Sequence, residues 1–350
     1  MGGWTMARIR FEIAKGESTF LDPRNGFQET THYFEVRLDP LTGRSGHFSH
    51  FGVIKPQKLP LSDYEKSEVK GFCPFCPDVR DKTTPKFVAG VLPEGRMIRG
   101  EATLVPNLFP YDVHSGVIIM ANDHVVPLER LTAKRVSDTY SVGVGFLRKI
   151  WSLDPSLPYH LITWNYMPPS GGGLVHPHQQ CSATQYPGNQ YMDELSSSKR
   201  FHEAYGANYW QEYVAEEKER ALRYIGSIGS SHWLSSFVSL GVLGEIVCVY
   251  PELFTVDDFG AEQVAELSDG LQRVFAYYRD NGIYSFNASL FFGPAGQNSF
   301  SCHFRIAPRT FLNMRDFAAD MSFHQMLLAE PVSVVMPEQL CADVKDYFMT

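Results

Sequence analysis

Residues 171–180 read Gly-Gly-Gly-Leu-Val-His-Pro-His-Gln-Gln. In an extended backbone, His176 and His178 are two positions apart, so their side chains point to the same face. One imidazole can then hold a metal ion or the backbone while the other faces a substrate. The glycines at Gly172 and Gly173 let a phosphate group come close to backbone N–H groups. The stretch therefore predicts phosphate chemistry at a histidine.

A possible zinc site precedes this stretch. Cys73-Pro74-Phe75-Cys76 has the spacing of two thiolate ligands of one zinc ion. With His124 and His176 it makes a Cys₂His₂ set, which leaves no coordination position open and is typical of structural zinc. The alternative is that Cys73 and Cys76 are small buried hydrophobic residues.

Composition excludes several functional classes. The chain has 350 residues and a formal net charge of −8, so it can bury a large core and is not a general binder of nucleic acid or of membrane surfaces. Residues 1–13 lack the apolar segment of a signal peptide, and no run of residues is long and apolar enough to span a membrane. Because six cysteines in a chain of this length do not indicate a disulfide scaffold, we expect a reducing, cytoplasmic location.

Two regions share one order of elements. The first predicts strands at 102–105 and 116–120, a helix at 132–153 and a strand at 159–165 before the two histidines. The second predicts a strand at 246–250, a helix at 260–281, a strand at 285–292 and a histidine-bearing strand at 301–306. This order indicates an internal duplication in which the second copy keeps one histidine of the pair.

Turns and charge patterns suggest the boundaries. We expect an N-terminal arm of short strands and loops at 1–70, rich in turn signals, and a first half with the zinc and histidine motifs at 71–191. We then expect a solvated helical linker at 192–229, a second half at 230–312 and a C-terminal extension at 313–350.

Further motifs occur in an order typical of one known family. They are Arg37-Leu38-Asp39-Pro40-Leu41-Thr42-Gly43, Cys73-Pro74-Phe75-Cys76, Asn107-Leu108-Phe109-Pro110, Asp123-His124-Val125, Asn165 and His176-Pro177-His178-Gln179-Gln180. With these motifs the chain resembles the galactose-1-phosphate uridylyltransferase branch of the histidine-triad superfamily. The ordered set is specific, whereas any one motif alone is weak.

The resemblance implies a fold and an assembly. The fold is α+β, with duplicated histidine-triad-like half-domains that are each an antiparallel sheet with a helix and together form one pseudo-symmetric domain. It also implies structural Zn²⁺ at the four ligands and a homodimer in which the partner chain completes the active site.

The resemblance also implies a mechanism. His178 attacks the α-phosphorus of a nucleoside-diphosphate compound and forms a nucleotidyl-His178 intermediate, chemistry for which a neutral imidazole is suited. A backbone carbonyl of the motif would orient the ring. Gln180 would donate to a non-bridging phosphate oxygen, and because an amide cannot protonate a leaving group it favours transfer over hydrolysis. The remaining substrate contacts would be Asn107, Phe109, Asn165, Gly172, Gly173 and Gln179.

Departures from the family pattern concern the acceptor. The pair of phosphate-binding arginines after the Thr42-Gly43 turn is missing, and Arg44, His47 or His50 would have to substitute. The acidic residue that reads sugar hydroxyls in the family falls at Gln325, an amide. A second metal site is expected to be absent, since Phe292 and Ser301 take the places of ligands and leave His303 alone. Recognition of ordinary galactose-1-phosphate is therefore in doubt.

Three functions remain open. The first is a nucleotidyltransferase that moves a nucleotide, with UMP favoured but adenine not excluded, from a nucleoside-diphosphate donor to another phosphate-bearing acceptor. The second is a phosphorylase in which inorganic phosphate takes the nucleotide. The third is a non-catalytic zinc protein that binds nucleotide or serves as a scaffold, against which the presence of His178 and Gln180 argues.

Overall fold

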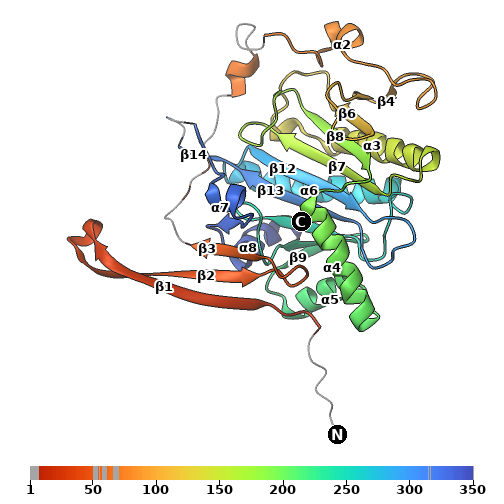
Figure 1. The fold of residues 1–350 in the computed structure, drawn as a ribbon. Coiled ribbons are helices and arrows are strands. Elements are labelled where there is room, and N and C mark those ends of the chain that lie inside the picture. The colour runs from red at the N-terminus through yellow and green to blue at the C-terminus, as the bar shows by residue number, and fades with distance from the viewer. Residues whose placement is uncertain are drawn as a thin grey trace.

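The computed structural model describes residues 8–49, 54, 56, 61–65, 71–313, 315 and 317–349. A ten-stranded sheet runs through the body of the molecule (Figure 1). Its strand order is β4-β5-β6-β8-β7-β12-β13-β11-β10-β9. The strands of its first half are β4 (Met97–Arg99), β5 (Ala102–Pro106), β6 (His114–Ile119), β7 (Tyr159–Tyr166) and β8 (His178–Thr184). Those of its second half are β9 (Tyr224–Ile228), β10 (Ser231–Ser235), β11 (Ile246–Val249), β12 (Ser285–Phe292) and β13 (His303–Arg309).

The two halves repeat one topology. In each half three strands lead to a long helix, α3 (Ala133–Leu153) or α6 (Ala261–Asp280), and two further strands follow it. The halves meet where β7 pairs antiparallel with β12 at the middle of the sheet. The expected α+β fold with two duplicated half-domains is therefore confirmed, and the predicted strands and helices of both copies lie within a few residues of their expected positions.

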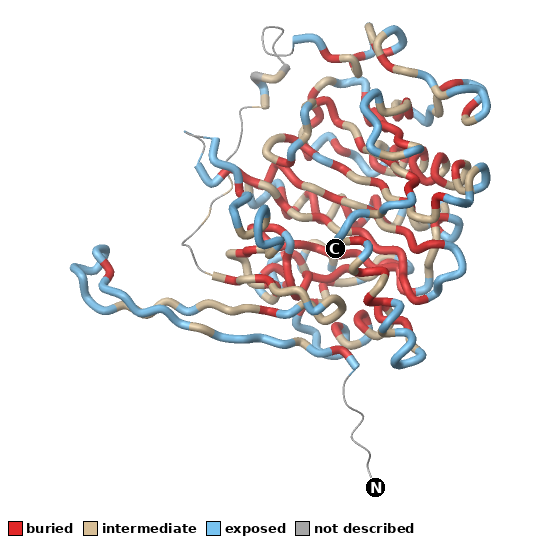
Figure 2. Tube along the Cα trace, in the orientation of Figure 1, coloured by how far each residue is buried: buried red, intermediate tan, exposed pale blue. Residues whose placement is uncertain are grey.

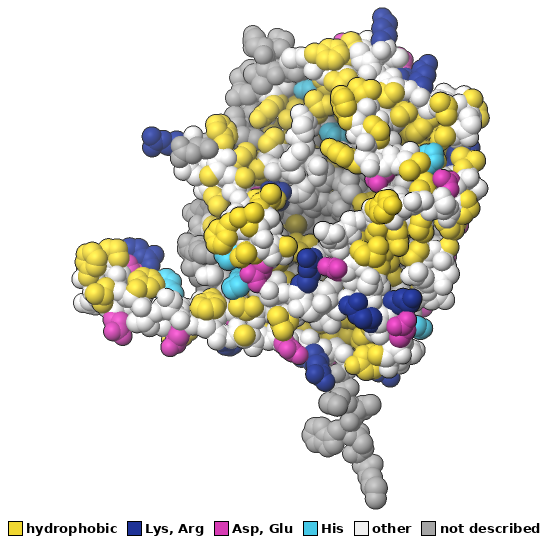
Figure 3. All heavy atoms as spheres, in the orientation of Figure 1, with side chains coloured by type: hydrophobic (Ala, Val, Ile, Leu, Met, Phe, Trp, Pro, Cys, Tyr) yellow, Lys and Arg dark blue, Asp and Glu magenta, His cyan; other side chains and the backbone are white. Residues whose placement is uncertain are grey.

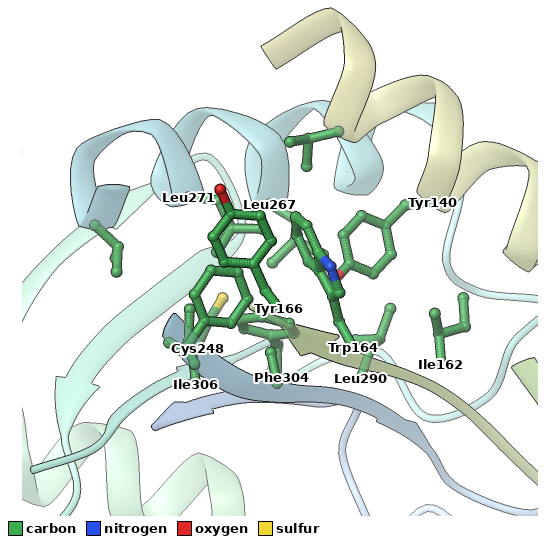
Figure 4. Close-up of a cluster of buried hydrophobic side chains, with 14 of the residues drawn as sticks. Tyr140, Ile162, Trp164, Tyr166, Cys248, Leu267, Leu271, Leu290, Phe304 and Ile306 are labelled. Carbon is green, nitrogen blue, oxygen red and sulfur yellow. The ribbon is translucent and has the colours of Figure 1, made fainter. Parts of the chain in front are cut away.

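Alternating side chains make the two sheet faces different. Along β7, Ile162, Trp164 and Tyr166 are buried, while Thr163 and Asn165 between them face the other way. The buried set packs beneath α3 and α6, where aromatic rings fill the space between helices and sheet (Figure 4). The opposite face of the first half carries polar side chains such as Asn165 and Gln180, together with a small buried apolar cluster of Val105, Val117 and Ile119.

Other helices and short elements complete the body. The second half is covered on its opposite face by α4 (Asn189–Tyr205) and α5 (Tyr209–Arg220), whose aromatic residues pack on β10 and β11. Among the described residues, the remaining helices are α2 (Pro77–Thr83), α7 (Phe323–Leu327) and α8 (Pro337–Phe348), and the short 3-10 turns are η1 (Pro23–Asn25), η2 (Leu61–Glu65) and η3 (Leu128–Arg130). Strands β14 (Phe311–Asn313) and β15 (Ala318–Ala319) pair with each other. The segment expected as a helical linker thus contains most of α4, all of α5 and strand β9 of the main sheet; its boundaries stay a prediction.

A long hairpin projects from the body. Strands β1 (Glu12–Asp22) and β2 (Gln28–Leu38) form it, and β3 (Ser45–Ser49) and β16 (Val332–Ser333) join β2 in a second sheet of order β1-β2-β3-β16 (Figure 1). The expectation of short strands alternating with turns was wrong here. The strands have 11 residues each, of which nine in β1 and four in β2 are exposed, so no period of apolar residues marks their length in the sequence.

None of the helices in the described ranges combines the length and the apolar character that crossing a membrane requires.

Helix packing leads to a first prediction, at Gly270 of α6. A Cβ added there would lie 2.0 Å from the indole ring of buried Trp233, so Gly270→Ala forces the helix and β10 apart. We expect a loss of about 1–3 kcal/mol in the free energy of unfolding, although alanine favours helix by about 1 kcal/mol. Gly145→Ala on α3 is the matched control, because its Cβ would meet only the Met97 sulfur at 3.7 Å, and it should not destabilise. Denaturant unfolding of both variants measures whether the free energy of unfolding falls in Gly270→Ala and is maintained in Gly145→Ala.

Candidate active site

The Cys-x-x-Cys segment and two remote histidines meet beside β8. The ligand atoms of Cys73, Cys76, His124 and His176 all lie within 4.8 Å of one another. Cys73 Sγ is 3.6 Å from His176 Nδ1, and Cys76 Sγ is 3.6 Å from His124 Nδ1. Sulfur and nitrogen ligands of a tetrahedral zinc ion, at about 2.3 and 2.05 Å from the metal, lie about 3.6 Å apart. The predicted ligand set therefore has the dimensions of a zinc site.

Hydrogen bonding prepares His176 for a metal ion. Its Nε2 lies 2.9 Å from the carbonyl oxygen of Ala121, which can only accept, so Nε2 carries the ring proton and Nδ1 keeps its lone pair toward the cysteines. Burial lowers the pKa of His176 to about 4 and raises the pKa of Cys73 to about 11. Neutral imidazole is the form that binds metal, while the thiol must lose its proton to a metal ion.

Arg80 on α2 supports this cluster, and sequence reasoning missed it. Its guanidinium is buried and donates to the carbonyl oxygens of Phe75 and Ala121 at 2.8 and 3.1 Å. It thus ties the Cys-x-x-Cys segment to the same carbonyl that holds His176. Nothing in the sequence marks Arg80, because its partners are backbone atoms that only folding brings near.

His178 opens β8 with a fixed ring. Its Nδ1 lies 2.7 Å from the carbonyl oxygen of His176, so Nδ1 carries the proton and Nε2 presents a lone pair. The expected backbone carbonyl of the motif is thus in place. Phe75 contacts the ring edge-on with centroids 5.2 Å apart, and burial lowers the pKa of His178. A neutral imidazole with one oriented nitrogen is a nucleophile ready at neutral pH.

Polar side chains continue from His178 across the neighbouring strands. Asn165 on β7 accepts from the Asn287 side chain of β12 at 2.6 Å, and Arg309 donates to Asn287 at 2.6 Å. The glycine loop folds over this row, since a Cβ on Gly172 would lie 3.3 Å from the Asn165 carbonyl oxygen. With neighbouring strands about 4.8 Å apart, Asn287 lies about 10 Å from the strand of His178. Predicted Asn165 and Gly172 therefore lie beside the histidine.

The two glutamines of the motif point to opposite faces of the sheet. Gln180 is half-buried and lies on the same face as His178, two positions along β8. Gln179 points through the opposite face, has no exposed surface, and sits beside the Tyr140 hydroxyl under α3. The expectation that Gln179 contacts substrate is therefore corrected: its side chain fills the core and does not crowd the His178 ring.

The other predicted contacts lie farther out. Asn107 directly follows β5, and its side-chain oxygen accepts from the Phe109 backbone N–H at 3.1 Å. Phe109 is 77% exposed on the loop between β5 and β6. Gly173 has no heavy atom within 4 Å of a Cβ placed on it, so the loop has room there. The structure thus brings Asn165, Gly172 and Gln180 to His178, and leaves the Phe109 ring in solvent.

The charged residues of the N-terminal motif at 37–43 make structural contacts. Arg37 is buried and donates to Glu338 of α8 and to Glu35, at 2.9–3.1 Å. Asp39 accepts from the backbone and hydroxyl of Thr42 and closes the following turn. These contacts anchor the N-terminal arm on the body. The charges of Arg37 and Asp39 are taken up by these partners and do not face His178.

The residues expected to replace the missing arginines are already paired. Arg44 donates to Gln190 at 2.7 Å and lies 3.4 Å from Asp193. His47 lies 3.0 Å from the Glu330 carboxylate. His50 lies outside the described residues.

A pocket of 260 Å³ opens on the polar side of the second half. Its polar lining includes Asn287, Arg305, Arg309, Asp320 and Gln325. Arg309 donates to the Asp320 carboxylate, and Arg305 forms ion pairs with Glu245 and Glu194. These carboxylates neutralise the charges of both arginines. The pocket shares Asn287 with the row that leads to His178, and Gln325 lies in its wall.

Comparison with known proteins agrees with this fold. No protein-family model matches the sequence. An uncharacterized protein of Archaeoglobus fulgidus is 26% identical over 318 residues, covering 89% of this chain and 92% of that protein. An ADP-glucose phosphorylase of Arabidopsis thaliana, solved with bound ADP-glucose, matches with a TM-score of 0.68 at 15% identity over 89% of this chain and 98% of that one. A galactose-1-phosphate uridylyltransferase-like protein of the same plant has a TM-score of 0.66 at 15% identity, again over 89% and 98%. A uridylyltransferase has a TM-score of 0.64 at 17% identity over 90% and 98%.

The chain shares the fold of these uridylyltransferase-like structures. The resemblance inferred from the motifs is thereby confirmed at the level of the fold.

Within this uridylyltransferase-like fold, the second half holds a copy of the histidine site that is closed. His303 opens β13 as His178 opens β8, and its Nδ1 lies 3.1 Å from the Ser301 carbonyl oxygen, the counterpart of the His176 carbonyl. The Trp210 ring stacks on His303 with centroids 4.1 Å apart, and the Glu194 carboxylate lies 3.2 Å from its Nε2. With no exposed surface, this imidazole cannot meet a substrate.

Proposed function

We propose that this protein is a nucleotidyltransferase that works through a covalent nucleotidyl-His178 intermediate. The observation that carries the proposal is the 2.7 Å contact of His178 Nδ1 with the His176 carbonyl, which leaves the Nε2 lone pair of a neutral ring to attack phosphorus. The fold of the nucleotide-handling proteins matched above supports it, although fold alone does not fix an activity.

The transfer would proceed in two displacements. In the first, His178 Nε2 forms a bond to the α-phosphorus of a nucleoside-diphosphate compound, and the bond from that phosphorus to the bridging oxygen breaks, releasing the distal phosphate group. In the second, an oxygen of a phosphate-bearing acceptor forms the new bond and the phosphorus–nitrogen bond breaks. Gln180, on the same sheet face, would donate its amide N–H groups to a non-bridging oxygen as charge builds there.

The metal ion we propose is structural Zn²⁺ held by Cys73, Cys76, His124 and His176. It would supply no chemistry to the reaction, because four protein ligands leave no position for substrate. Its effect on His178 is through the backbone, since the carbonyl that orients His178 belongs to the ligand His176.

The second-half pocket is where we place the part of the substrate beyond the α-phosphate. Its amide and carboxylate groups, with Phe291 and Met321 as apolar wall, suit a polyhydroxylated group such as a sugar. Because Arg44 and His47 already have partners, we propose that ordinary galactose-1-phosphate is not the acceptor.

A phosphorylase is the second candidate. The arginine pair that binds a sugar phosphate is missing, and inorganic phosphate is an acceptor that needs no sugar contacts. The structural match to an ADP-glucose phosphorylase favours the same activity.

We further propose a cytoplasmic homodimer, with UMP or AMP as the transferred nucleotide and neither nucleic acid nor membrane as a partner.

The experiment that tests the function is intact-protein mass spectrometry with UDP- and ADP-sugars, each without acceptor. We expect a gain of one nucleotidyl group, labile to acid, whose mass names the base. Adding inorganic phosphate or a panel of sugar phosphates to the isolated adduct then separates phosphorylase from transferase by which one discharges it. If no donor leaves an adduct on protein that holds its zinc, the covalent mechanism is wrong and a nucleotide-binding protein becomes the better description.

A further inference from the structure

A row of polar side chains crosses the middle of the main sheet, starting at His178. Asn165 and Asn287 lie opposite each other where β7 pairs with β12, and continuing the register of β7 with β8 places Asn165 opposite His178. Most of the main sheet lies in the buried body of the molecule (Figure 2), but Asn165 is exposed on this face. The pocket of the second half opens on the same face, where the surface is hollowed (Figure 3). Asn287 therefore lies between the histidine and the pocket.

Two partners of fixed polarity determine which way the Asn287 amide faces. Its Nδ2 lies 2.8 Å from the backbone carbonyl oxygen of Ser170, which can only accept a hydrogen bond. Its Oδ1 lies 2.6 Å from Nη1 of Arg309, which can only donate. Turning the amide over would set a carbonyl against a carbonyl and one N–H donor against another. The nitrogen of Asn287 therefore faces Ser170, and its oxygen faces Arg309.

This orientation fixes the polarity of Asn165 in turn. The second N–H of Asn287 donates to Oδ1 of Asn165 at 2.6 Å, so the Asn165 oxygen is occupied. The Asn165 amide nitrogen is left with its two N–H groups on an exposed residue opposite His178. An amide nitrogen donates to a phosphate oxygen, whereas an amide oxygen repels it. Asn165 thus offers the group that a phosphate requires.

The far end of the row is anchored by a buried ion pair. Arg309 donates through Nε and Nη2 to the Asp320 carboxylate at 2.6–3.0 Å, and the same carboxylate accepts from the Thr310 backbone N–H at 3.0 Å. Asp320 is only 5% exposed. A guanidinium has donors and no acceptor at any ordinary pH, so it cannot reverse its polarity. The direction of donation is therefore set from Arg309 through Asn287 to Asn165.

We propose that Asn287 is a positioning residue, which orients Asn165 so that its amide N–H groups meet a substrate phosphate held at His178. The inference rests on the proposed function, since the phosphate is that of the nucleotide donor. Asn287 itself lies about 10 Å from the strand of His178 and does not touch the reacting atoms. A donor that already faces the site needs no reorientation as charge builds on the phosphate oxygens.

Asn287→Asp reverses the polarity at nearly constant shape. The carboxylate keeps Arg309 as its partner but presents an acceptor to Asn165, whose amide then turns over and directs its oxygen at the phosphate. We expect the rate of adduct formation at saturating donor to fall about 100-fold, the cost of losing one donor to a developing oxyanion. Asn287→Leu is the matched control, because a neutral side chain of similar size leaves the Asn165 amide free to turn toward the phosphate. It should cost less than about tenfold, and melting curves verify that both variants fold.

The same substitution in an Asn165→Ala background shows whether the effect passes through Asn165. Added negative charge or a displaced glycine loop slows the reaction equally in both backgrounds, whereas a loss that acts through Asn165 disappears once its amide is gone. We expect Asn165→Ala alone to lose about 100-fold and N165A/N287D to lose no more than about tenfold beyond that. Equal factors in the two backgrounds, or Asn287→Leu as slow as Asn287→Asp, would overturn the proposal.

Calorimetric binding of ADP and UDP separates a failure of this inference from a failure of the proposed function. If the native protein forms no adduct, the covalent mechanism is wrong, but the same four proteins still test Asn287, because the polarity of Asn165 affects any phosphate bound beside it. Asn287→Asp should then raise the dissociation constant about tenfold in the native background and much less in Asn165→Ala. Equal changes in both backgrounds refute the inference alone. A native protein that forms no adduct and binds neither diphosphate refutes both.

Discussion

In His178→Ala we expect no nucleotidyl adduct with any donor and a fall in turnover of at least about 10⁴-fold. In the proposed mechanism the change removes the nitrogen that bonds to phosphorus, and removing a covalent nucleophile costs more than removing any contact that stabilises charge. The ring donates to the His176 carbonyl and contacts Phe75, but it is not a ligand of the metal cluster. Zinc content should therefore remain one ion per chain. Rapid-quench measurement of adduct formation, with metal analysis alongside, checks both parts.

His114→Ala is the matched control for this result. His114 begins β6 of the same sheet and pairs with Ala183, at the other end of β8 from His178. The variant removes an imidazole from the same sheet without touching the site, so the adduct should form at the native rate. A His178→Ala protein that still gained the nucleotidyl mass would show that another side chain is the nucleophile.

In Cys76→Ser we expect zinc to be lost and the melting temperature to fall by about 10 °C. Metal binding free energy becomes folding free energy when the site exists only in the folded chain, and losing a buried ligand of such a site costs about 3–5 kcal/mol. The pKa of Cys73 is raised to about 11 by burial, so its thiol holds its proton until a metal ion displaces it. Zinc affinity should accordingly fall as pH is lowered, because the metal competes with protons for the thiolates. Calorimetry with and without a chelator measures the stability.

Cys181→Ser supplies the comparison. Cys181 is a buried thiol on β8 that contacts the Gly116 carbonyl oxygen and lies outside the cluster. It should lose some stability, since a hydroxyl replaces sulfur in the core, but keep its zinc. Full zinc occupancy in Cys76→Ser would show that the cluster is a set of buried thiols and imidazoles with no metal function.

Much of the architecture could be read from the chain. The strands and helices of both halves follow from periods of apolar residues, such as the alternation along β7, and the duplication follows from their repeated order. The Cys-x-x-Cys spacing, taken with His124 and His176, predicted a ligand set that the structure brings within 4.8 Å. The length of the hairpin β1–β2 was missed, because nearly all side chains of β1 are exposed and most of those of β2 are only partly buried, so neither strand has a clear apolar pattern.

The sequence by itself determined which chemical groups are present and their local spacing: two thiols, a histidine pair on an extended strand, and an amide two positions beyond His178. Tertiary structure alone decided how those groups are used. The Ala121 carbonyl fixes which ring nitrogen of His176 carries the proton. The core that forms on one face of the sheet buries the Gln179 side chain. The Trp210 ring covers His303 in the second half, whereas His178 in the first half stays beside polar neighbours. The physical reason is that each of these partners lies far away in the chain. Hydrogen-bond geometry and burial depend on which strands become neighbours, and local residue patterns do not contain that information.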